Sequence, residues 1–313
     1  MKASRVISKL VNVKDEWAKK RYVHLPTSTA HTILLSAMGR SGSTWIASLI
    51  NFSNTHRDIF EPFLPIRVAE ANVFEYTQYL NPQVDDPRYF EAAKNILEGR
   101  LKRQDWLDSG NTRLFSHKRL IKDIRTNLML GWFHRKFPAM KIILLIRNPF
   151  SVVQSFMDLG WGMEPCGTRR EIDILLGQKE LLTDFPIIEQ SLTKVDIEDT
   201  FESLMLQWCI MNYVPLKQLS GTSIHLTFYE NYMLNPHLEI ERVYDFINQK
   251  LDPRIFYTLK QPSRTSYSKR EFRIDNIKFN SEQIDRGYQM LDMFGLANLY
   301  ERNLNPRYPH VNS

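Results

Sequence analysis

Residues 36–45 read SAMGRSGSTW and directly follow the apolar run TILL at 32–35. A turn of small residues between a strand and a helix points several backbone N–H groups at one spot, where the helix dipole adds partial positive charge. Gly39 and Gly42 allow an anion to approach the backbone closely. The side-chain donors are Arg40, Ser41, Ser43 and Thr44. The stretch predicts a phosphate-binding turn; the alternative is an ordinary capped turn in which Ser41 or Ser43 caps the helix.

Apolar segments on both sides of this turn predict the fold class. Those with the composition of buried parallel strands are TILLSAM (32–38), RLFSHKRLI (113–121), KIILLIR (141–147) and SIHLTFY (223–229). Helix patterns lie between them, at residues 43–52, 126–138, 149–160 and 196–221. Alternating strands and helices imply parallel βαβ units with right-handed crossovers. We therefore expect a three-layer α/β fold with a central parallel sheet flanked by helices.

The length of 313 residues favours one elaborated domain over two complete ones. We expect a single domain over residues 1–313, with an N-terminal extension at 1–30. Helical insertions are expected at 53–112 and 160–200. Insertions that follow strands in open sheets commonly shape substrate pockets. We therefore expect these two to shape a binding site for an acceptor molecule, beside the phosphate-binding turn.

Composition excludes several classes of protein. The net charge of +6 and the pI near 9.1 favour an anionic partner, and the charges are too spread out for a long nucleic acid. The two cysteines, Cys166 and Cys209, exclude a disulfide framework, and Cys209 lies in a buried-looking helix. No apolar stretch is long enough to cross a membrane, and the basic N-terminus lacks the apolar core of a signal peptide. We expect a cytoplasmic protein.

Three motifs resemble those of sulfotransferases that use 3′-phosphoadenosine 5′-phosphosulfate (PAPS). RSGSTW (40–45) resembles their 5′-phosphosulfate-binding loop, and KIILLIRNPFSVVQSF (141–156) resembles their 3′-phosphate-binding strand, turn and helix. In the second motif, Arg147 and Ser155 stand at the family's spacing. LTFYENYMLNP (226–236) is similar to a strand that ends in Tyr-Glu before a helix.

The resemblance implies a P-loop-like fold, transfer of a sulfuryl group from PAPS to a hydroxyl group, and no metal ion. It implies cofactor binding by Arg40, Ser41, Gly42, Ser43, Thr44, Trp45, Arg147, Ser155 and Tyr229. Trp45 and Tyr229 correspond to the residues that contact adenine, with core packing as the alternative for each. Arg40 would stabilise charge that develops on the departing phosphate. Arg264 and Arg270 are candidates to close over the nucleotide.

The catalytic base is the point at which two branches of this family differ. Sulfotransferases of small phenols and steroids carry Lys-Thr-His, and the similar segment RLIKDIR (119–125) has Ile124 in place of the His. Lys122 matches the Lys of that motif, so the resemblance implies a catalytic role for Lys122. Carbohydrate sulfotransferases are similar over residues 40–63, with Glu-Pro after the first helix. Glu61 occupies that place. This implies a saccharide or other alcohol as acceptor.

Glu61 is therefore our expected base, with burial raising its pKa toward the working pH. The alternative is a solvated loop carboxylate paired with Arg57 or Arg67. Asp123 and His117 are the other candidates for the base.

Two other functions remain open from the sequence. An atypical P-loop phosphotransferase would need a Mg-binding Asp at a strand end, for which Asp123 is the obvious residue, but the loop lacks the Lys of GxxxxGK[ST]. A non-catalytic protein that binds nucleotides or polyanions would need only the basic charge.

Overall fold

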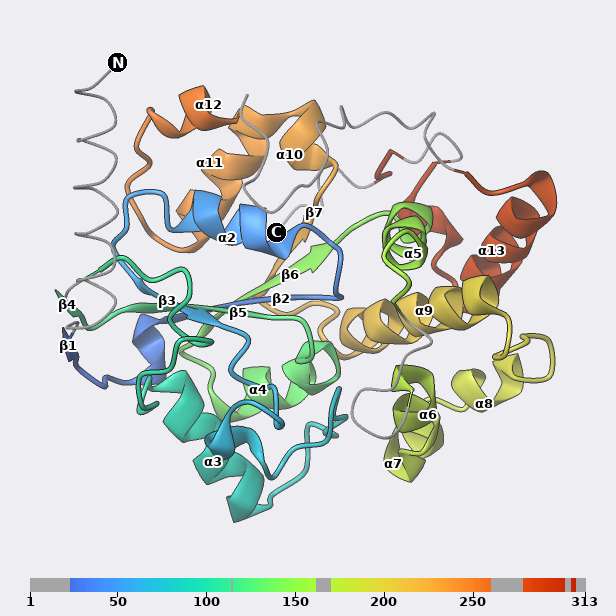
Figure 1. Cartoon of the computed structure of the whole chain (residues 1–313), viewed down its shortest axis with the longest axis horizontal. Coiled ribbons are helices and arrows are strands. Elements are labelled where there is room, and N and C mark those ends of the chain that lie inside the picture. Colours follow the sequence, from blue (N-terminus) through green and yellow to red (C-terminus); the bar gives the residue numbers. More distant parts are fainter. Residues whose placement is uncertain (1–22, 114, 162–169, 260–277, 302–304, 308–313) are drawn as a thin grey trace.

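The computed structural model describes residues 23–113, 115–161, 170–259, 278–301 and 305–307. Within these residues, the central sheet has five parallel strands in the order β3-β5-β2-β6-β7 (Figure 1). They are β2 (Thr32–Ala37), β3 (Arg57–Phe60), β5 (Arg119–Asp123), β6 (Lys141–Ile146) and β7 (His225–Phe228). A second, two-stranded parallel sheet pairs β1 (Val23–His24) with β4 (Phe115–Ser116).

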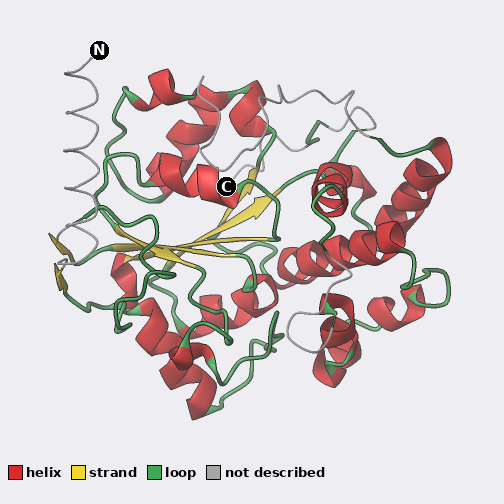
Figure 2. Cartoon of the chain, viewed as in Figure 1, coloured by secondary structure: helices red, strands yellow, loops and turns green. Residues whose placement is uncertain are grey.

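Helices cover both faces of the central sheet, which confirms the three-layer α/β fold (Figure 2). One face carries α2 (Ser43–Ile50), α10 (Asn231–Leu234), α11 (Pro236–Phe246) and α12 (Ile255–Thr258). The other carries α3 (Pro87–Leu97), α4 (Leu130–Lys136) and α9 (Thr200–Gln218), with α5 (Pro149–Met157) and α13 (Ser281–Met293) packed on α9. The remaining helices are α6 (Glu171–Leu176), α7 (Lys179–Asp184), α8 (Ile187–Ser191), η1 (Thr29–His31), η2 (Ala69–Ala71), η3 (Asn127–Met129) and η5 (Ala297–Leu299). In the described part of the chain, no helix combines the length and apolar content that a bilayer crossing requires.

The position of β2 at the centre of the sheet explains why its sequence is mostly apolar. All six of its residues are buried. Leu34 packs into the core beneath α3, α4 and α9, whereas Ile33 and Leu35 pack into the core beneath α2 and α11. Side chains alternate between the two faces of a strand, so a strand covered on both faces has no polar face.

The strand predictions needed two corrections. The segment 113–121 does not form one strand: β4 and β5 are separate, and β5 continues to Asp123. Residues 57–60 form the edge strand β3, which lies inside the region expected to be a helical insertion. Its sequence RDIF carries two charges, and the buried Arg57 is paired with Asp108 at 2.9 Å.

Either Asp196 or Asp199 could cap the long helix α9 from its sequence, and the structure selects Asp199, whose side chain accepts a hydrogen bond from the Glu202 N–H at 2.8 Å. Cys209 is buried within this helix, as expected. Cys166, Arg264, Arg270 and most of the N-terminal extension lie outside the described residues.

Because the strands are parallel, the segments that follow them meet at one edge of the sheet. Glu61 N–H donates to the Lys122 carbonyl oxygen at 2.7 Å, and Tyr229 N–H donates to the Ile146 carbonyl oxygen at 2.9 Å. The turn at 38–42 and Arg147 follow β2 and β6 at this same edge. Residues predicted from distant motifs are therefore brought to one place.

Candidate functional site

The turn between β2 and α2 is tight, as predicted. Ser41 N–H donates to the Met38 carbonyl oxygen at 3.3 Å, and α2 begins directly after Gly42. Arg40 and Gly42 have φ angles of 64° and 79°. Non-glycine residues are uncommon in this left-handed region and cluster at functional sites. The N-terminus of α2 thus opens at the carboxyl edge of the sheet, the location that suits an anion.

Gly42 is required by the ring of Tyr229. A Cβ atom at position 42 would lie 2.3 Å from Cε2 and 2.6 Å from Cδ2 of Tyr229. Any side chain would therefore have to displace this ring, in addition to adopting the positive φ of this residue. Gly42 therefore allows the turn to lie directly against the Tyr229 ring, at the end of β7.

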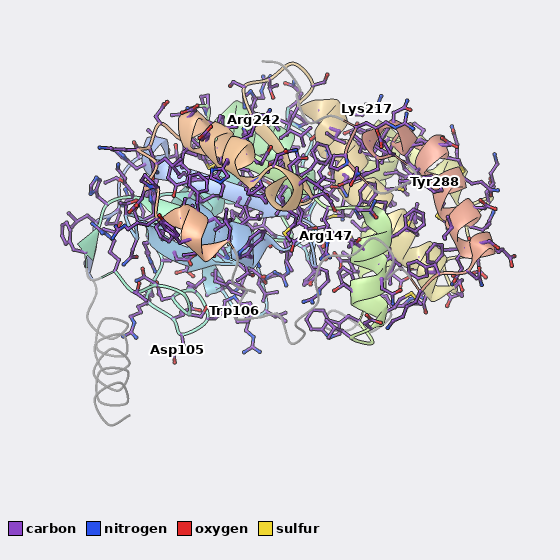
Figure 3. The ribbon with its side chains drawn as sticks, turned by 90° about the horizontal axis from the view of Figure 1, so that it is seen from above. Asp105, Trp106, Arg147, Lys217, Arg242 and Tyr288 are labelled. Carbon is purple, nitrogen blue, oxygen red and sulfur yellow. The ribbon has the colours of Figure 1, made fainter. Side chains whose placement is uncertain are left out.

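Arg147 joins the second predicted motif to the first. Its Nη1 donates to the carbonyl oxygen of Arg40 at 2.8 Å, and its guanidinium lies 4.7 Å from the ring centroid of Tyr229. Its own carbonyl oxygen accepts a hydrogen bond from Trp208 Nε1 at 2.9 Å. Arg147 lies near the middle of the molecule in the view of Figure 3. The first two contacts orient the guanidinium of Arg147, and the third holds its backbone.

Arg40 makes the reciprocal contact with the second motif. Its Nε donates to Ser155 Oγ on α5 at 3.0 Å, and its guanidinium lies 5.5 Å from the ring centroid of Trp161. Burial and the nearby charge of Arg147 lower the pKa of Arg40. The two positive charges repel each other, so an anion bound near both would be favoured.

Several buried polar atoms at this edge have no partner in the described part of the protein. They are Ser41 Oγ, Arg147 Nε and Asn148 Nδ2. A buried polar group without a hydrogen bond costs roughly 1–3 kcal/mol, so such groups are rare unless they meet a ligand or water. All three atoms can donate, which suits an acceptor such as a phosphate oxygen.

The other residues of the turn differ in their exposure. Ser43 is buried, whereas Thr44 is exposed on the first turn of α2. Trp45 is half-buried and packs edge-on against Tyr229 at 5.7 Å and Tyr232 at 6.3 Å. Trp45 and Tyr229 therefore form one aromatic group beside the turn.

Glu61 differs from our expectation in its partners and its pKa. It is 5% exposed, and Lys122 Nζ and Arg125 Nη1 contact its carboxylate oxygens at 2.5 and 2.8 Å. Burial acts to raise the pKa of Glu61, but the two cations outweigh it and lower this pKa below its ordinary value. The expected rise in pKa is thus wrong, and Glu61 is neither solvated nor paired with Arg57 or Arg67.

Comparison of the sequence with known families agrees with these motifs. The model of the sulfotransferase domain family matches residues 30–288. The chain belongs to the sulfotransferase family. No curated protein matches the sequence of this sulfotransferase significantly.

Solved structures with a similar fold include other sulfotransferases. The sulfotransferase domain from the curacin biosynthetic pathway is 18% identical, with a TM-score of 0.42, over 79% of this chain and 82% of that one. Sulfotransferase STF9 from Mycobacterium avium is 12% identical, with a TM-score of 0.47, over 85% and 77% of the two chains. Mouse sulfotransferase SULT7A1, complexed with PAP, is 12% identical, with a TM-score of 0.38, over 79% and 66%.

The two other candidates for the base occupy unfavourable places in this sulfotransferase. Asp123 is completely buried, and burial raises its pKa to about 6. Its Oδ1 and Oδ2 accept hydrogen bonds from the N–H groups of Arg125 and Phe63 at 2.8 and 2.9 Å. His117 precedes β5 and therefore lies at the opposite edge of the sheet from the turn between β2 and α2.

Sequence reasoning missed Arg125 and Asn148. Arg125 is 7% exposed, pairs with Glu61 and lies 4.7 Å from the ring centroid of Tyr76. Nothing in the sequence links residues 61 and 125. Asn148 could have been found, because Asn before Pro is a recognisable helix start, and its side chain indeed accepts from Ser151 N–H at 3.3 Å.

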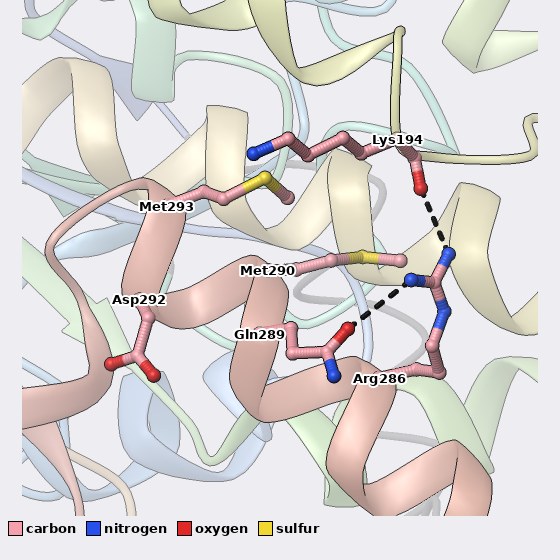
Figure 4. A pocket seen from close by; sticks show the side chains of 6 residues that line it. All are labelled: Lys194, Arg286, Gln289, Met290, Asp292 and Met293. Atoms are coloured by element: carbon pink, nitrogen blue, oxygen red, sulfur yellow. Dashed lines mark hydrogen bonds between the residues drawn. The ribbon is translucent and has the colours of Figure 1, made fainter.

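A pocket of about 310 Å³ lies elsewhere in the sulfotransferase, at α13 and the segment before α9 (Figure 4). Its lining residues are Lys194, Arg286, Gln289, Met290, Asp292 and Met293. Arg286 donates to the Lys194 carbonyl oxygen at 2.8 Å and to Gln289 Oε1 at 3.2 Å. None of these residues belongs to the predicted site. Among the described residues, no group of three or more His, Cys, Asp and Glu side chains is arranged to hold a metal ion.

Proposed function

We propose that this sulfotransferase moves the sulfuryl group of PAPS to a hydroxyl group of an acceptor, a saccharide or other alcohol. The observation that carries the proposal is the set of unpartnered donors on Ser41, Arg147 and Asn148, beside the hydrogen bond from Arg147 Nη1 to the Arg40 carbonyl oxygen. Donors fixed in this way suit a ligand with two separate phosphate groups. The PAP complex of mouse SULT7A1 is consistent with such a ligand.

The two phosphate groups of PAPS would use different ends of the site. The 5′-phosphosulfate would lie on the turn at Arg40, Ser41, Gly42, Ser43 and Thr44. The 3′-phosphate would lie at Arg147 and Ser155, which follow β6. Trp45 and Tyr229, already packed together, would hold the adenine. Because Arg40 and Arg147 are hydrogen-bonded, the binding of one phosphate would order the residues for the other.

In the reaction, the acceptor oxygen would attack sulfur in line with the bond between sulfur and the bridging phosphate oxygen. The new S–O bond forms as the old one breaks, the bonding electrons pass to the 5′-phosphate of PAP, and the proton of the acceptor hydroxyl passes to solvent water. Arg40 and the N–H groups of the turn would stabilise the charge on the departing phosphate. Loss of one such preorganised donor typically lowers the rate about 100- to 1000-fold.

Glu61 enters this proposal as the residue that holds Lys122 and Arg125 at the carboxyl edge of the sheet. A carboxylate with a lowered pKa that already accepts from two cations is a poor base. Lys122 would then face the transferring group with its orientation fixed. The saccharide-type acceptor rests on the Glu-Pro motif and on Ile124 in place of a catalytic His.

The structure does not favour the alternative function, a phosphotransferase, because Asp123 is unsuited to bind Mg. A Mg-binding Asp must present free carboxylate oxygens, and both oxygens of Asp123 accept backbone hydrogen bonds in a buried position.

Calorimetric titration with PAP tests the proposal, alongside 5′-AMP and ATP, each with and without Mg. We expect tight binding of PAP that needs no metal and is much weaker for 5′-AMP, which lacks the 3′-phosphate. Preference for ATP with Mg would instead support a phosphotransferase. Binding of PAP that is no tighter than that of 5′-AMP, and that disappears with moderate salt, would support a general polyanion-binding protein.

A further inference from the structure

A buried carboxyl group, Glu230, lies behind the Arg147 turn. Its Oε1 accepts a hydrogen bond from the backbone N–H of Asn148 at 2.9 Å. Its Oε2 accepts one from the hydroxyl group of Tyr300 at 3.2 Å. Glu230 is 0% exposed and Tyr300 is 3% exposed, so water does not compete for these bonds.

The three residues come from separate parts of the chain. Glu230 follows β7, Asn148 caps the start of α5, and Tyr300 follows η5 near the C-terminus. The ring of Tyr300 packs edge-on against Phe228 at 5.6 Å, which fixes the direction of its hydroxyl group. The C-terminal segment is thereby connected, through one carboxyl group, to the residue next to Arg147.

Burial and pairing show that this arrangement is costly to build. Burial raises the pKa of Glu230 to about 7 and raises that of Tyr300. The charged group that faces Glu230 is Arg147, which acts in the opposite direction. A buried ionisable group that serves only packing can commonly be replaced by an apolar one without loss of stability. Packing alone therefore does not explain a carboxyl group at position 230, beside Arg147.

We propose that Glu230 and Tyr300 are a positioning pair that fixes the Arg147–Asn148 turn in the conformation that receives the 3′-phosphate. The proposal rests on the proposed function, because it assumes that Arg147 binds this phosphate. Glu230 touches no reacting atom. It acts through the Asn148 N–H, and Tyr300 acts through Glu230.

Three variants test the pair. Glu230→Leu removes the acceptor for Asn148 N–H, Glu230→Gln keeps an oxygen that can accept it, and Tyr300→Phe removes only the hydroxyl group. The dissociation constants of PAP and 5′-AMP are measured for each by calorimetry. Tyr79→Phe is the matched control, since Tyr79 is also buried and donates to a carboxylate, Asp184, at 2.5 Å.

We expect Glu230→Leu and Tyr300→Phe to lower the affinity for PAP about tenfold, which is the typical effect of losing a hydrogen bond to a charged group. The affinity for 5′-AMP should fall by a clearly smaller factor, because Glu230 and Tyr300 reach the 5′-phosphate turn only indirectly, through the hydrogen bond from Arg147 to the Arg40 carbonyl oxygen. The dissociation constant of PAP for Glu230→Gln should stay within about threefold of the wild-type value. The control, Tyr79→Phe, should bind PAP as the wild type does. If Glu230→Leu does not fold, Tyr300→Phe carries the test.

The outcomes separate this inference from the function on which it rests. A wild-type protein that does not prefer PAP to 5′-AMP overturns the proposed function and this inference with it. A wild-type protein with that preference, which Tyr300→Phe retains in full, overturns the positioning pair alone. An equal loss for PAP and 5′-AMP would mean general destabilisation and would also overturn it.

Discussion

Arg147 Nη1 donates a hydrogen bond to the carbonyl oxygen of Arg40 at 2.8 Å. Arg40 in turn donates from Nε to Ser155 Oγ at 3.0 Å, so each predicted phosphate motif contacts the other. The contact is possible because β2 and β6 are adjacent parallel strands and both motifs follow their carboxyl ends. A change in one motif should therefore affect binding at both.

Arg147→Lys tests this coupling. Lys keeps the charge but lacks the planar fork that can contact the Arg40 carbonyl oxygen and a phosphate together. We expect the affinity for PAP to fall about tenfold or more, measured by calorimetry, and the affinity for 5′-AMP to fall as well. Arg88→Lys, on the exposed surface, is the control. Unchanged affinity for both nucleotides would contradict the coupling.

Gly42→Ala should both destabilise the protein and weaken nucleotide binding. The left-handed conformation costs an Ala about 1–2 kcal/mol, and its Cβ atom would displace the Tyr229 ring. Gly160→Ala is a matched control, because Gly160 has a φ of 67° with no atom within 4 Å of a Cβ atom. Thermal unfolding should show a larger loss at position 42. Equal losses would mean that backbone strain alone matters.

Glu61→Gln should lower the free energy of unfolding by about 3–5 kcal/mol, because it leaves Lys122 and Arg125 buried without an anionic partner. Denaturant titration measures this. Asp85→Asn is the control: it removes a salt bridge to Lys136 in which Asp85 is exposed, and no measurable loss is expected. PAP affinity should be spared in Glu61→Gln and turnover lowered. A variant as stable as the wild type would contradict the proposed role of Glu61.

Glu230 should make stability depend on pH in an unusual direction. Its pKa is raised from 4.5 to about 7, so the folded chain holds this proton over a range in which the unfolded chain has lost it. The contribution of Glu230 is therefore fully present below about pH 4.5 and is lost as the pH rises through about 7. Buried His56 and His225, whose pKa values are lowered to about 4, act in the opposite direction.

Comparison with Glu230→Gln isolates the Glu230 contribution. From about pH 5 to about pH 8, the wild type should lose roughly 1–3 kcal/mol of unfolding free energy relative to the variant, measured by denaturant titration at each pH. Parallel pH profiles of the two proteins would show that Glu230 does not titrate in this range.

The local motifs could be predicted from the sequence because each depends on neighbouring residues. The β2 turn and α2 are specified by an apolar run, two glycines and a helix pattern within residues 32–50. The start of α5 is specified by Asn148 and Pro149. The edge strand β3 could not be predicted, because two of its four residues are charged and the residue that pairs with Arg57, Asp108, lies 51 positions away.

By itself, the sequence determined the α/β class, the glycine-containing turn between β2 and α2 and the family, since these follow from short-range patterns. Only the tertiary structure decided which charges meet. It placed Lys122 and Arg125 on Glu61, which lowers a pKa that burial alone would raise. It also brought Tyr300 to Glu230, behind the Arg147 turn. The physical reason is that burial and charge pairing depend on distances between residues far apart in the chain, and folding alone sets those distances.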